Sequence, residues 1–194
     1  MFKKLSLLLI LMMVMALAAS ACGGKNKKKV ELKQTFESTT GITIRYPDGW
    51  TAREDANGIQ IANKDQVLDQ ATGAEFPSDG FDVTIMPPLS LADLGLADDA
   101  TVKDIMSAVL GDEITGSGDV TTGGAVSMKV KGEEAARVSI RDSSNSSEGF
   151  VVVLKIETNT VIAAMAFAHE GKLQSYNDLA QRMLESITYT APAS

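Results

Sequence analysis

Four apolar stretches follow one another between residues 126 and 168, and they constrain the fold of this chain more than any other feature. The first two, 126–130 and 136–140, alternate apolar with polar residues, which is the period of a half-buried strand. The last two, 150–156 and 161–168, are apolar at nearly every position. Short connections join all four, so the sequence predicts an antiparallel meander whose last two strands are central and covered on both faces.

An amphipathic helix is predicted before these strands, over residues 101–110, where the apolar residues fall on one face. Thr101 is followed three residues later by Asp104, a spacing that resembles a capping box in which Asp replaces the usual Glu. Gly111 is expected to end this helix, and residues 111–124 are expected to form a loop.

A second amphipathic helix is predicted near the end of the chain, at about residues 175–187. Ser175 and Asp178 have the spacing of a capping pair at its start. The residues of its inner stripe are Tyr176, Ala180, Met183, Leu184 and Ile187.

Residues 34–63 are predicted to form paired short strands, since 42–46 alternate and Asn57-Gly58 is a strong hairpin signal. Residues 64–80 are expected to be irregular, and 81–85 alternate again. Early strands, a helix, a run of strands and a last helix together predict an α+β fold, in which helices flank an antiparallel sheet.

The first 21 residues have the order of a secretory signal peptide. Lys3 and Lys4 precede an uncharged, mostly apolar run over 5–18, and small residues follow it. The alternative is a transmembrane anchor, but 14 helical residues span only about 21 Å of a hydrocarbon core of about 30 Å. The sequence therefore favours export.

Cys22 is the only cysteine, so no disulfide can form within the chain. Residues 19–22, Ala-Ser-Ala-Cys, resemble a bacterial lipobox, in which the cysteine is lipidated and the signal peptide is cut just before it. The alternatives are a small buried cysteine or a free thiol left after ordinary cleavage. Lipidation would supply two or more acyl chains, enough for stable anchoring. Residues 22–33 would then be a flexible, lysine-rich tether beside the membrane.

The remaining domain, residues 34–194, is strongly acidic, with 11 Lys and Arg against 24 Asp and Glu and a net charge of −13. This balance argues against nucleic acid as a partner, because nucleic-acid binding needs basic patches. It also holds the domain away from anionic headgroups. An acidic surface does not by itself identify a cationic partner, since it also serves solubility.

Three segments resemble PsbP-like and DcrB-like domains. "GITIRYPDGW" (41–50) is similar to their opening strand and turn, and "GEEAARVSI" (132–140) to one of their inner strands. "FAHEGKLQSYNDLAQRMLESI" (167–187) is similar to their closing strand and helix. The resemblance covers roughly residues 34–190.

This resemblance implies an α/β/α sandwich with a central antiparallel sheet, as in the Ran-binding Mog protein. It also implies a non-enzymatic binding or accessory role, as for the PsbP proteins that support photosystem II and for many bacterial lipoproteins. No catalytic or ligand-binding residue carries over, because the shared residues are architectural. These are Tyr46, Pro47, Gly49 and Trp50.

Few residues suggest chemistry. A catalytic triad would need His169, the only histidine, together with Asp178 and a serine, but no nucleophile motif occurs. A zinc site would need more His and Cys ligands than the chain has. Calcium is less easily excluded, although no calcium-loop motif is present. Its candidate ligands are Asp93, Asp98, Asp99, Asp112 and Glu113.

The sequence therefore predicts a non-catalytic lipoprotein without cofactor or metal, anchored by Cys22 to the extracytoplasmic face of a bacterial cell membrane. Its domain is expected to bind or stabilise another envelope protein. The alternative is a lipoprotein that binds a small molecule or lipid, for example one serving a transporter. A hydrophobic cavity between sheet and helices would favour that alternative.

Overall fold

The computed structural model describes residues 29–69, 74–115, 119–157 and 159–192. Its largest part is a nine-stranded antiparallel sheet in the order β3-β4-β5-β11-β10-β9-β7. The remaining two strands lie off this order. β6 pairs with the part of β11 that β5 does not reach, and β8 pairs with the part of β9 that β7 does not reach. The strands are β3 (Thr51–Asp55), β4 (Gly58–Ala62), β5 (Phe81–Ile85), β6 (Leu89–Ser90), β7 (Val120–Thr122), β8 (Val126–Val130), β9 (Glu133–Asp142), β10 (Ser147–Lys155) and β11 (Thr160–His169).

The two most apolar strands, β10 and β11, are paired at the centre of the sheet, as the sequence predicts. On β10, Phe150 and Val152 face one side while Val151 and Val153 face the other, and all four are buried. Successive strand residues point to opposite faces, so a strand that is apolar throughout requires a layer on each side.

One of these layers is α4 (Leu173–Ser186) together with a small sheet of β1 (Leu32–Glu37), β2 (Ile42–Pro47) and β12 (Thr188–Tyr189). Aromatic rings fill the space between them and the large sheet. Phe81 stacks on Tyr176 with ring centroids 4.5 Å apart, and Trp50 lies 5.7 Å from Phe81. Trp50 is therefore architectural, as its place in the predicted turn and core implies.

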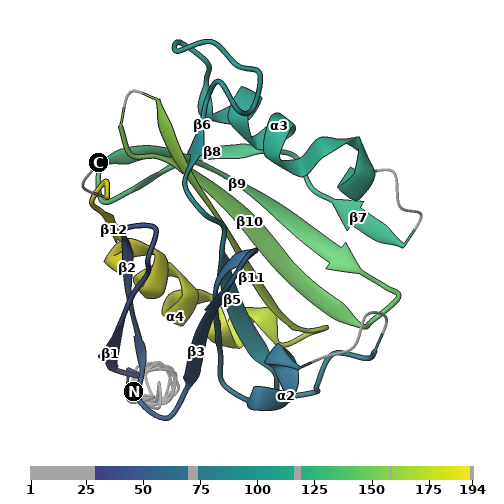
Figure 1. The fold of residues 1–194 in the computed structure, drawn as a ribbon. Helices are drawn as coiled ribbons and strands as arrows, with labels where there is room; N and C mark the ends of the chain where they lie inside the picture. The colour runs from purple at the N-terminus through teal and green to yellow at the C-terminus, as the bar shows by residue number, and fades with distance from the viewer. Residues whose placement is uncertain (1–28, 70–73, 116–118, 158, 193–194) are drawn as a thin grey trace, which may run out of the picture. The chain divides into compact units, whose positions relative to one another are not determined.

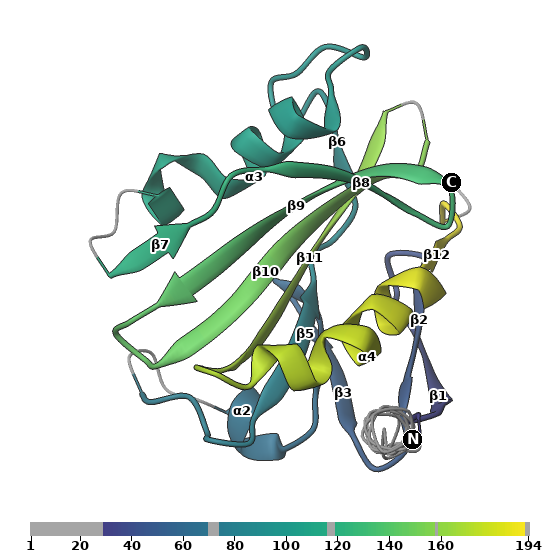
Figure 2. The ribbon, with the colours of Figure 1, turned by 180° about the vertical axis from the view of Figure 1, so that it is seen from behind.

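The other layer is α3 (Val102–Thr115), which buries Val102, Ile105, Met106 and Leu110 against β9 and β10. Its predicted capping box is confirmed: Thr101 Oγ1 donates to Asp104 Oδ2 at 2.6 Å, and the Asp104 N–H donates back at 3.3 Å. Figures 1 and 2 show α3 and α4 on opposite faces of the large sheet. The α+β, α/β/α fold class is therefore confirmed.

The expected loop at 111–124 is only partly correct. Gly111 does interrupt α3, because its φ of 55° and ψ of 174° are not helical. The chain then resumes a helical turn to Thr115, and Val120–Thr122 pair with β9 as an edge strand. Short edge strands have little sequence signal, because pairing with a neighbour holds them in place.

The predicted start of the last helix is wrong by two residues. α4 begins at Leu173, and its N-cap, Lys172, makes no side-chain cap. The Ser175 hydroxyl instead donates to the Lys172 carbonyl, and Asp178 pairs with Arg182 at 3.0 Å. The predicted inner stripe is confirmed at Ala180, Met183, Leu184 and Ile187. Tyr176 is only half-buried, and Leu179, which was not predicted, is buried.

The segment predicted to be irregular, 64–80, contains one helical turn, α2 (Asp65–Leu68). It lies beside β4 and β5, on the same face of the large sheet as α3. In the described part of the chain, no helix is both long and apolar enough to cross a membrane.

Candidate functional site

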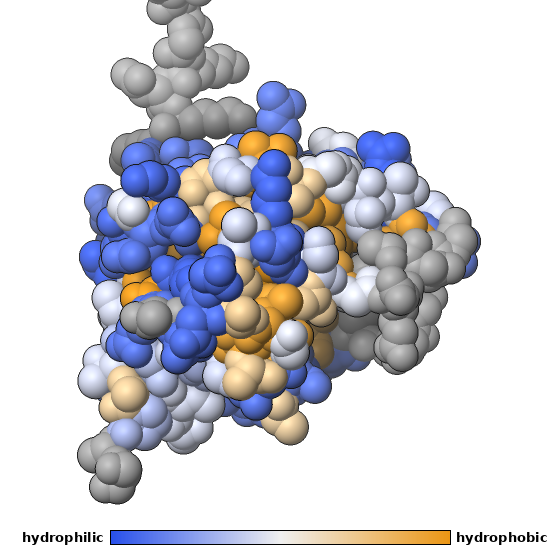
Figure 3. Space-filling model, turned by 90° about the horizontal axis from the view of Figure 1, so that it is seen from above, coloured by the Kyte–Doolittle hydropathy of each residue, from blue (hydrophilic) through white to orange (hydrophobic). Residues whose placement is uncertain are grey.

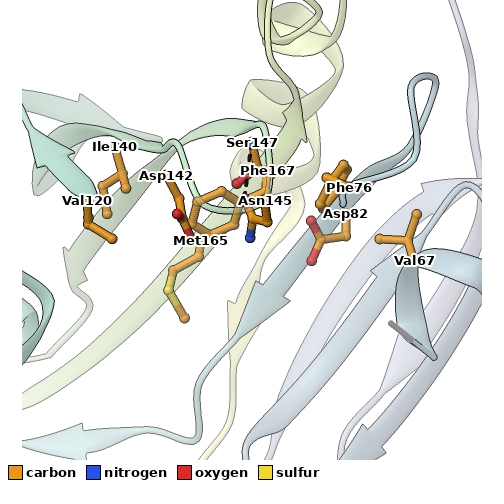
Figure 4. A pocket seen from close by; sticks show the side chains of 10 residues that line it. All are labelled: Val67, Phe76, Asp82, Val120, Ile140, Asp142, Asn145, Ser147, Met165 and Phe167. Carbon is orange, nitrogen blue, oxygen red and sulfur yellow. Dashed lines mark hydrogen bonds between the residues drawn. The ribbon is translucent and has the colours of Figure 1, made fainter. Parts of the chain in front are cut away.

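A cavity of about 320 Å³ lies on the α3 face of the large sheet, between α2 and β7. Side chains of β5, β9, β10 and β11 form its floor (Figure 4). Six of its lining residues are apolar and four are polar. They are Val67, Phe76, Val120, Ile140, Met165 and Phe167, with Asp82, Asp142, Asn145 and Ser147.

The floor of the cavity follows from strand periodicity. On β5, Phe81 and Val83 point into the α4 core, so Asp82 between them points to the opposite face. Asp82 is paired in register with Phe167, and the next position in the same row of the sheet is Gly149. A Cβ at Gly149 would lie 2.5 Å from Cδ1 of Phe167, so the missing side chain lets that ring lie close to the sheet.

The wall opposite β7 is made by α2 and by residues 74–80. Polar contacts fix α2 to β3: Thr51 donates to Asp65 at 2.6 Å, and Arg53 pairs with Asp69 at 2.8 Å. The Phe76 N–H donates to the Asn145 carbonyl at 2.8 Å, which ties this wall to the β9–β10 loop. Segments far apart in sequence therefore enclose the site.

Asp82 is the most unusual residue in the cavity. Its Oδ1 is the one buried side-chain N or O atom without a hydrogen-bond partner among the residues that the structure describes. Thr84 lies 3.5 Å from Oδ2, too far for a strong hydrogen bond. Burial raises the pKa of this carboxyl from 3.8 to about 7, and its few hydrogen bonds offset that effect only in part.

The carboxylate of Asp82 points into the cavity, toward Phe167 and Asn145 (Figure 4). The second carboxylate, on Asp142, comes from the end of β9 and already accepts bonds from the backbone and hydroxyl of Ser144. The side-chain amide oxygen of Asn145, Oδ1, is also engaged, because it accepts a hydrogen bond from the Ser147 N–H at 3.1 Å. Among the described residues that line this cavity, Asp82 Oδ1 is thus the buried side-chain atom without a hydrogen-bond partner.

The residues considered for catalysis are not brought together. His169 ends β11, where its Nδ1 lies 3.1 Å from the Glu170 carbonyl oxygen and its Nε2 3.9 Å from Glu75. Asp178 lies on α4 and pairs with Arg182 instead.

The calcium candidates are also dispersed. Asp93 accepts bonds from Ser90, and the Asp98 carbonyl accepts one from Lys155, while Asp99 lines a separate depression beside the start of α3. The side chains of Asp112 and Glu113 lie outside the described residues, as does Cys22. Within the described part, no three His, Cys, Asp or Glu residues gather as metal ligands would.

Sequence reasoning did not single out Asp82. Its signal is a charged residue within the alternating strand 81–85, and that pattern ordinarily marks the solvent face of a half-buried strand. No local feature of the sequence indicates that Val67 and Phe76 enclose that face.

The helices on both faces and the antiparallel strand order define an α/β/α sandwich of the PsbP-like type. No protein-family model and no curated protein matches the sequence. Among solved structures, cyanobacterial PsbP (CyanoP) from Synechocystis sp. PCC 6803 matches with a TM-score of 0.50 and 15% identity, over 87% of this chain and 97% of that chain.

Two further solved structures resemble the chain less. The Ran-binding protein Mog1p of Saccharomyces cerevisiae has a TM-score of 0.49 and 12% identity, over 83% of this chain and 96% of that chain. LpqN, involved in cell envelope biogenesis of Mycobacterium tuberculosis, has a TM-score of 0.47 and 16% identity, over 77% of this chain and 83% of that chain. At these identities the likeness concerns the fold alone.

Proposed function

We propose that this protein is a non-catalytic binding protein, held at the extracytoplasmic face of a bacterial membrane by a lipid on Cys22, and that its domain takes up a small molecule. The observation that carries this function is the cavity between α2 and β7. Its apolar walls and few polar groups have the composition of a ligand pocket, and about 300 Å³ is enough for a small ligand.

The proposal of a non-catalytic role is supported by the arrangement of the polar groups in the cavity. A nucleophile needs a neighbouring base within hydrogen-bond reach. The cavity offers Ser147, whose side chain is buried, and two carboxylates, while His169 contacts Glu75 and Glu170. These groups can recognise a ligand without transforming it.

Native mass spectrometry of the full-length protein, released from its own membranes in mild detergent, tests ligand uptake. We expect a bound small molecule on the wild-type chain and its loss in Val120→Trp, because Val120 lines the cavity and the indole would fill it. Thr121→Trp is the matched control, since Thr121 follows Val120 in β7, is exposed and points to the opposite face of the sheet. A ligand carried equally by Val120→Trp would refute the assignment of this cavity.

A protein partner is the second candidate function, and the edge strand β8 favours it. Among the described residues β8 pairs only with β9, and Val126 at its start is 63% exposed. An edge strand of this kind can accept a strand from another protein. Hydrophobic residues also form a patch among hydrophilic ones at the end of the domain that carries β6 and α3 (Figure 3).

Cross-linking of the lipidated protein in native membranes tests this second function. One recurrent partner, lost in Val126→Lys, would support it. The same partner retained in Val126→Lys would exclude β8 as the docking strand.

A further inference from the structure

We propose that the cavity between α2 and β7 selects a cationic ligand, a small apolar amine whose ammonium group pairs with Asp82. This inference rests on the proposed function and adds the chemical class of the ligand. It is carried by the carboxylate of Asp82, which lines the cavity and points toward it, and whose Oδ1 lacks a hydrogen-bond partner among the described residues.

An unpartnered buried carboxylate oxygen is costly, and the hydrogen bonds of Asp82 with Thr84 and the Phe167 backbone offset the cost of burial only in part. Among the residues that the structure describes, no Lys or Arg lines the cavity. The neighbours of Asp82 in the described part of the chain are apolar, because α2 supplies Val67, β4 supplies Ala62 and β11 supplies Phe167, and no nearby charge contributes to the pKa shift of this carboxyl. An ammonium group in the cavity supplies the carboxylate of Asp82 with an opposite charge and a hydrogen-bond donor.

The second titratable group that lines the cavity is also acidic. Asp142 lines the same space from β9, so the described lining offers two carboxylates and no cationic side chain. An anionic head, such as that of a fatty acid, would meet two like charges in a poorly solvated site. The cavity therefore discriminates against carboxylates and favours amines.

The walls of the cavity distinguish an organic amine from a metal ion. Calcium takes six to eight oxygen ligands, whereas most of this lining is aliphatic, aromatic or thioether. Phe76, Phe167 and Met165 offer contact surface for a flat apolar body, and aromatic faces also attract cations. An arylalkylamine matches this combination of an apolar chamber with one buried carboxylate.

The test is isothermal titration calorimetry of the full-length protein in detergent with three probes that share one apolar body. The probes are 2-phenylethylamine, 2-phenylethanol and 3-phenylpropanoate. We expect the amine to bind at least tenfold more tightly than the alcohol at pH 8, and the carboxylate not to bind. Asp82→Asn should weaken the amine at least tenfold and leave the alcohol unchanged, whereas Asp48→Asn, the same charge change on an exposed turn, should alter neither.

The pH dependence of amine affinity is a second measurement, and a merely structural role of Asp82 would leave it unchanged. With a pKa of about 7 in the empty cavity, the ionised fraction of Asp82 rises about tenfold between pH 6 and pH 8, while an amine stays protonated. Amine affinity should rise by about that factor in the wild type and stay flat in Asp82→Asn.

The outcomes separate the two proposals. Equal binding of all three probes, blocked by Val120→Trp, would leave the cavity as a binding site but overturn its selectivity for amines. If none of the probes binds at millimolar concentration, the inference is overturned. The proposed function is tested independently, by native mass spectrometry of the protein released from its own membranes.

Discussion

At the scale of single residues, Asp82 affects stability as well as recognition. Burial without a nearby positive charge disfavours the charged form of its carboxyl group. Because the folded state raises its pKa, the folded protein binds this proton more tightly than the unfolded chain does. The contribution of Asp82 to stability is therefore fully present below about pH 4 and is lost as the pH rises through about 7.

Asp82→Asn should consequently stabilise the protein at high pH. A neutral amide of the same shape avoids the desolvation of the carboxylate, which amounts to as much as ~4 kcal/mol for a pKa raised from 3.8 to about 7. Urea unfolding at pH 4 and pH 8 measures this: we expect nearly equal stabilities at pH 4 and a more stable variant at pH 8. An advantage of the same size at both pH values would contradict this explanation.

Gly149 is the second residue whose identity is dictated by its surroundings. A Cβ there would lie 2.2 Å from the Ala166 carbonyl oxygen, a backbone atom that cannot move aside without shifting β11. Gly149→Ala should therefore destabilise the protein by ~2–4 kcal/mol, measured as a change in the free energy of unfolding. Gly124→Ala is the control, since nothing lies within 4 Å of its Cβ position, and we expect little change.

At the scale of elements, α3 is the clearest case in which local sequence and tertiary packing agree. Its N-terminus is closed by reciprocal bonds between Thr101 and Asp104, and hydrogen bonds from Thr101 lower the pKa of Asp104. Its buried face packs on the central strands β9 and β10. The N-cap residue of α4, Lys172, makes no side-chain cap; the N–H of Leu173 donates instead to Glu148 Oε1 of β10 at 2.9 Å, and the inner stripe of the helix packs on the large sheet.

Thr101→Ala should destabilise the protein by about 1 kcal/mol, because the N–H of Asp104 loses its acceptor at the helix start. Thermal or urea unfolding at pH 7 measures this change. Ser107→Ala is a matched control, since this hydroxyl is exposed and bonds only within the helix, to the Lys103 carbonyl. An equal loss in both variants would mean that capping is not the cause.

At the scale of the whole molecule, the chain joins an acidic domain to a basic segment next to Cys22. Residues 34–194 carry a net charge of −13, with 11 of the 18 Lys and Arg residues, and the other 7 precede them. In the proposed arrangement the acyl chains and the lysines hold the protein at the membrane, while the domain is repelled from anionic headgroups.

Cys22→Ser should abolish incorporation of radiolabelled palmitate and block cleavage of the signal peptide at that site. The variant should then migrate as the larger precursor on a denaturing gel, because cleavage before the cysteine follows lipidation. Ser20→Ala is the control and should be labelled and processed as the wild type is. Unchanged labelling of Cys22→Ser would refute the lipid anchor.

Most helices and strands, and the side of each that is buried, follow from local sequence patterns. The local patterns are the strand alternation of β2, β5, β8 and β9, the continuous apolar runs of β10 and β11, and the apolar stripes of α3 and α4. They indicate most of the buried side chains, although Val126 at the start of β8 is exposed. The same patterns limit the answer to an antiparallel sheet with a helical layer on each face. Edge strands such as β7 and the single turn of α2 are missed, because contacts with neighbours hold them in place.

Only the tertiary structure decided that Asp82 is enclosed. The alternation of β5 correctly assigns the side chain of Asp82 to the face away from the α4 core, and in a half-buried antiparallel strand that face is usually solvated. The enclosure arises because β5 pairs with β11, 80 or so residues later, and because Val67, Phe76 and Val120 converge from three separate segments. Such convergence depends on contacts between distant residues, which no local period of the sequence encodes.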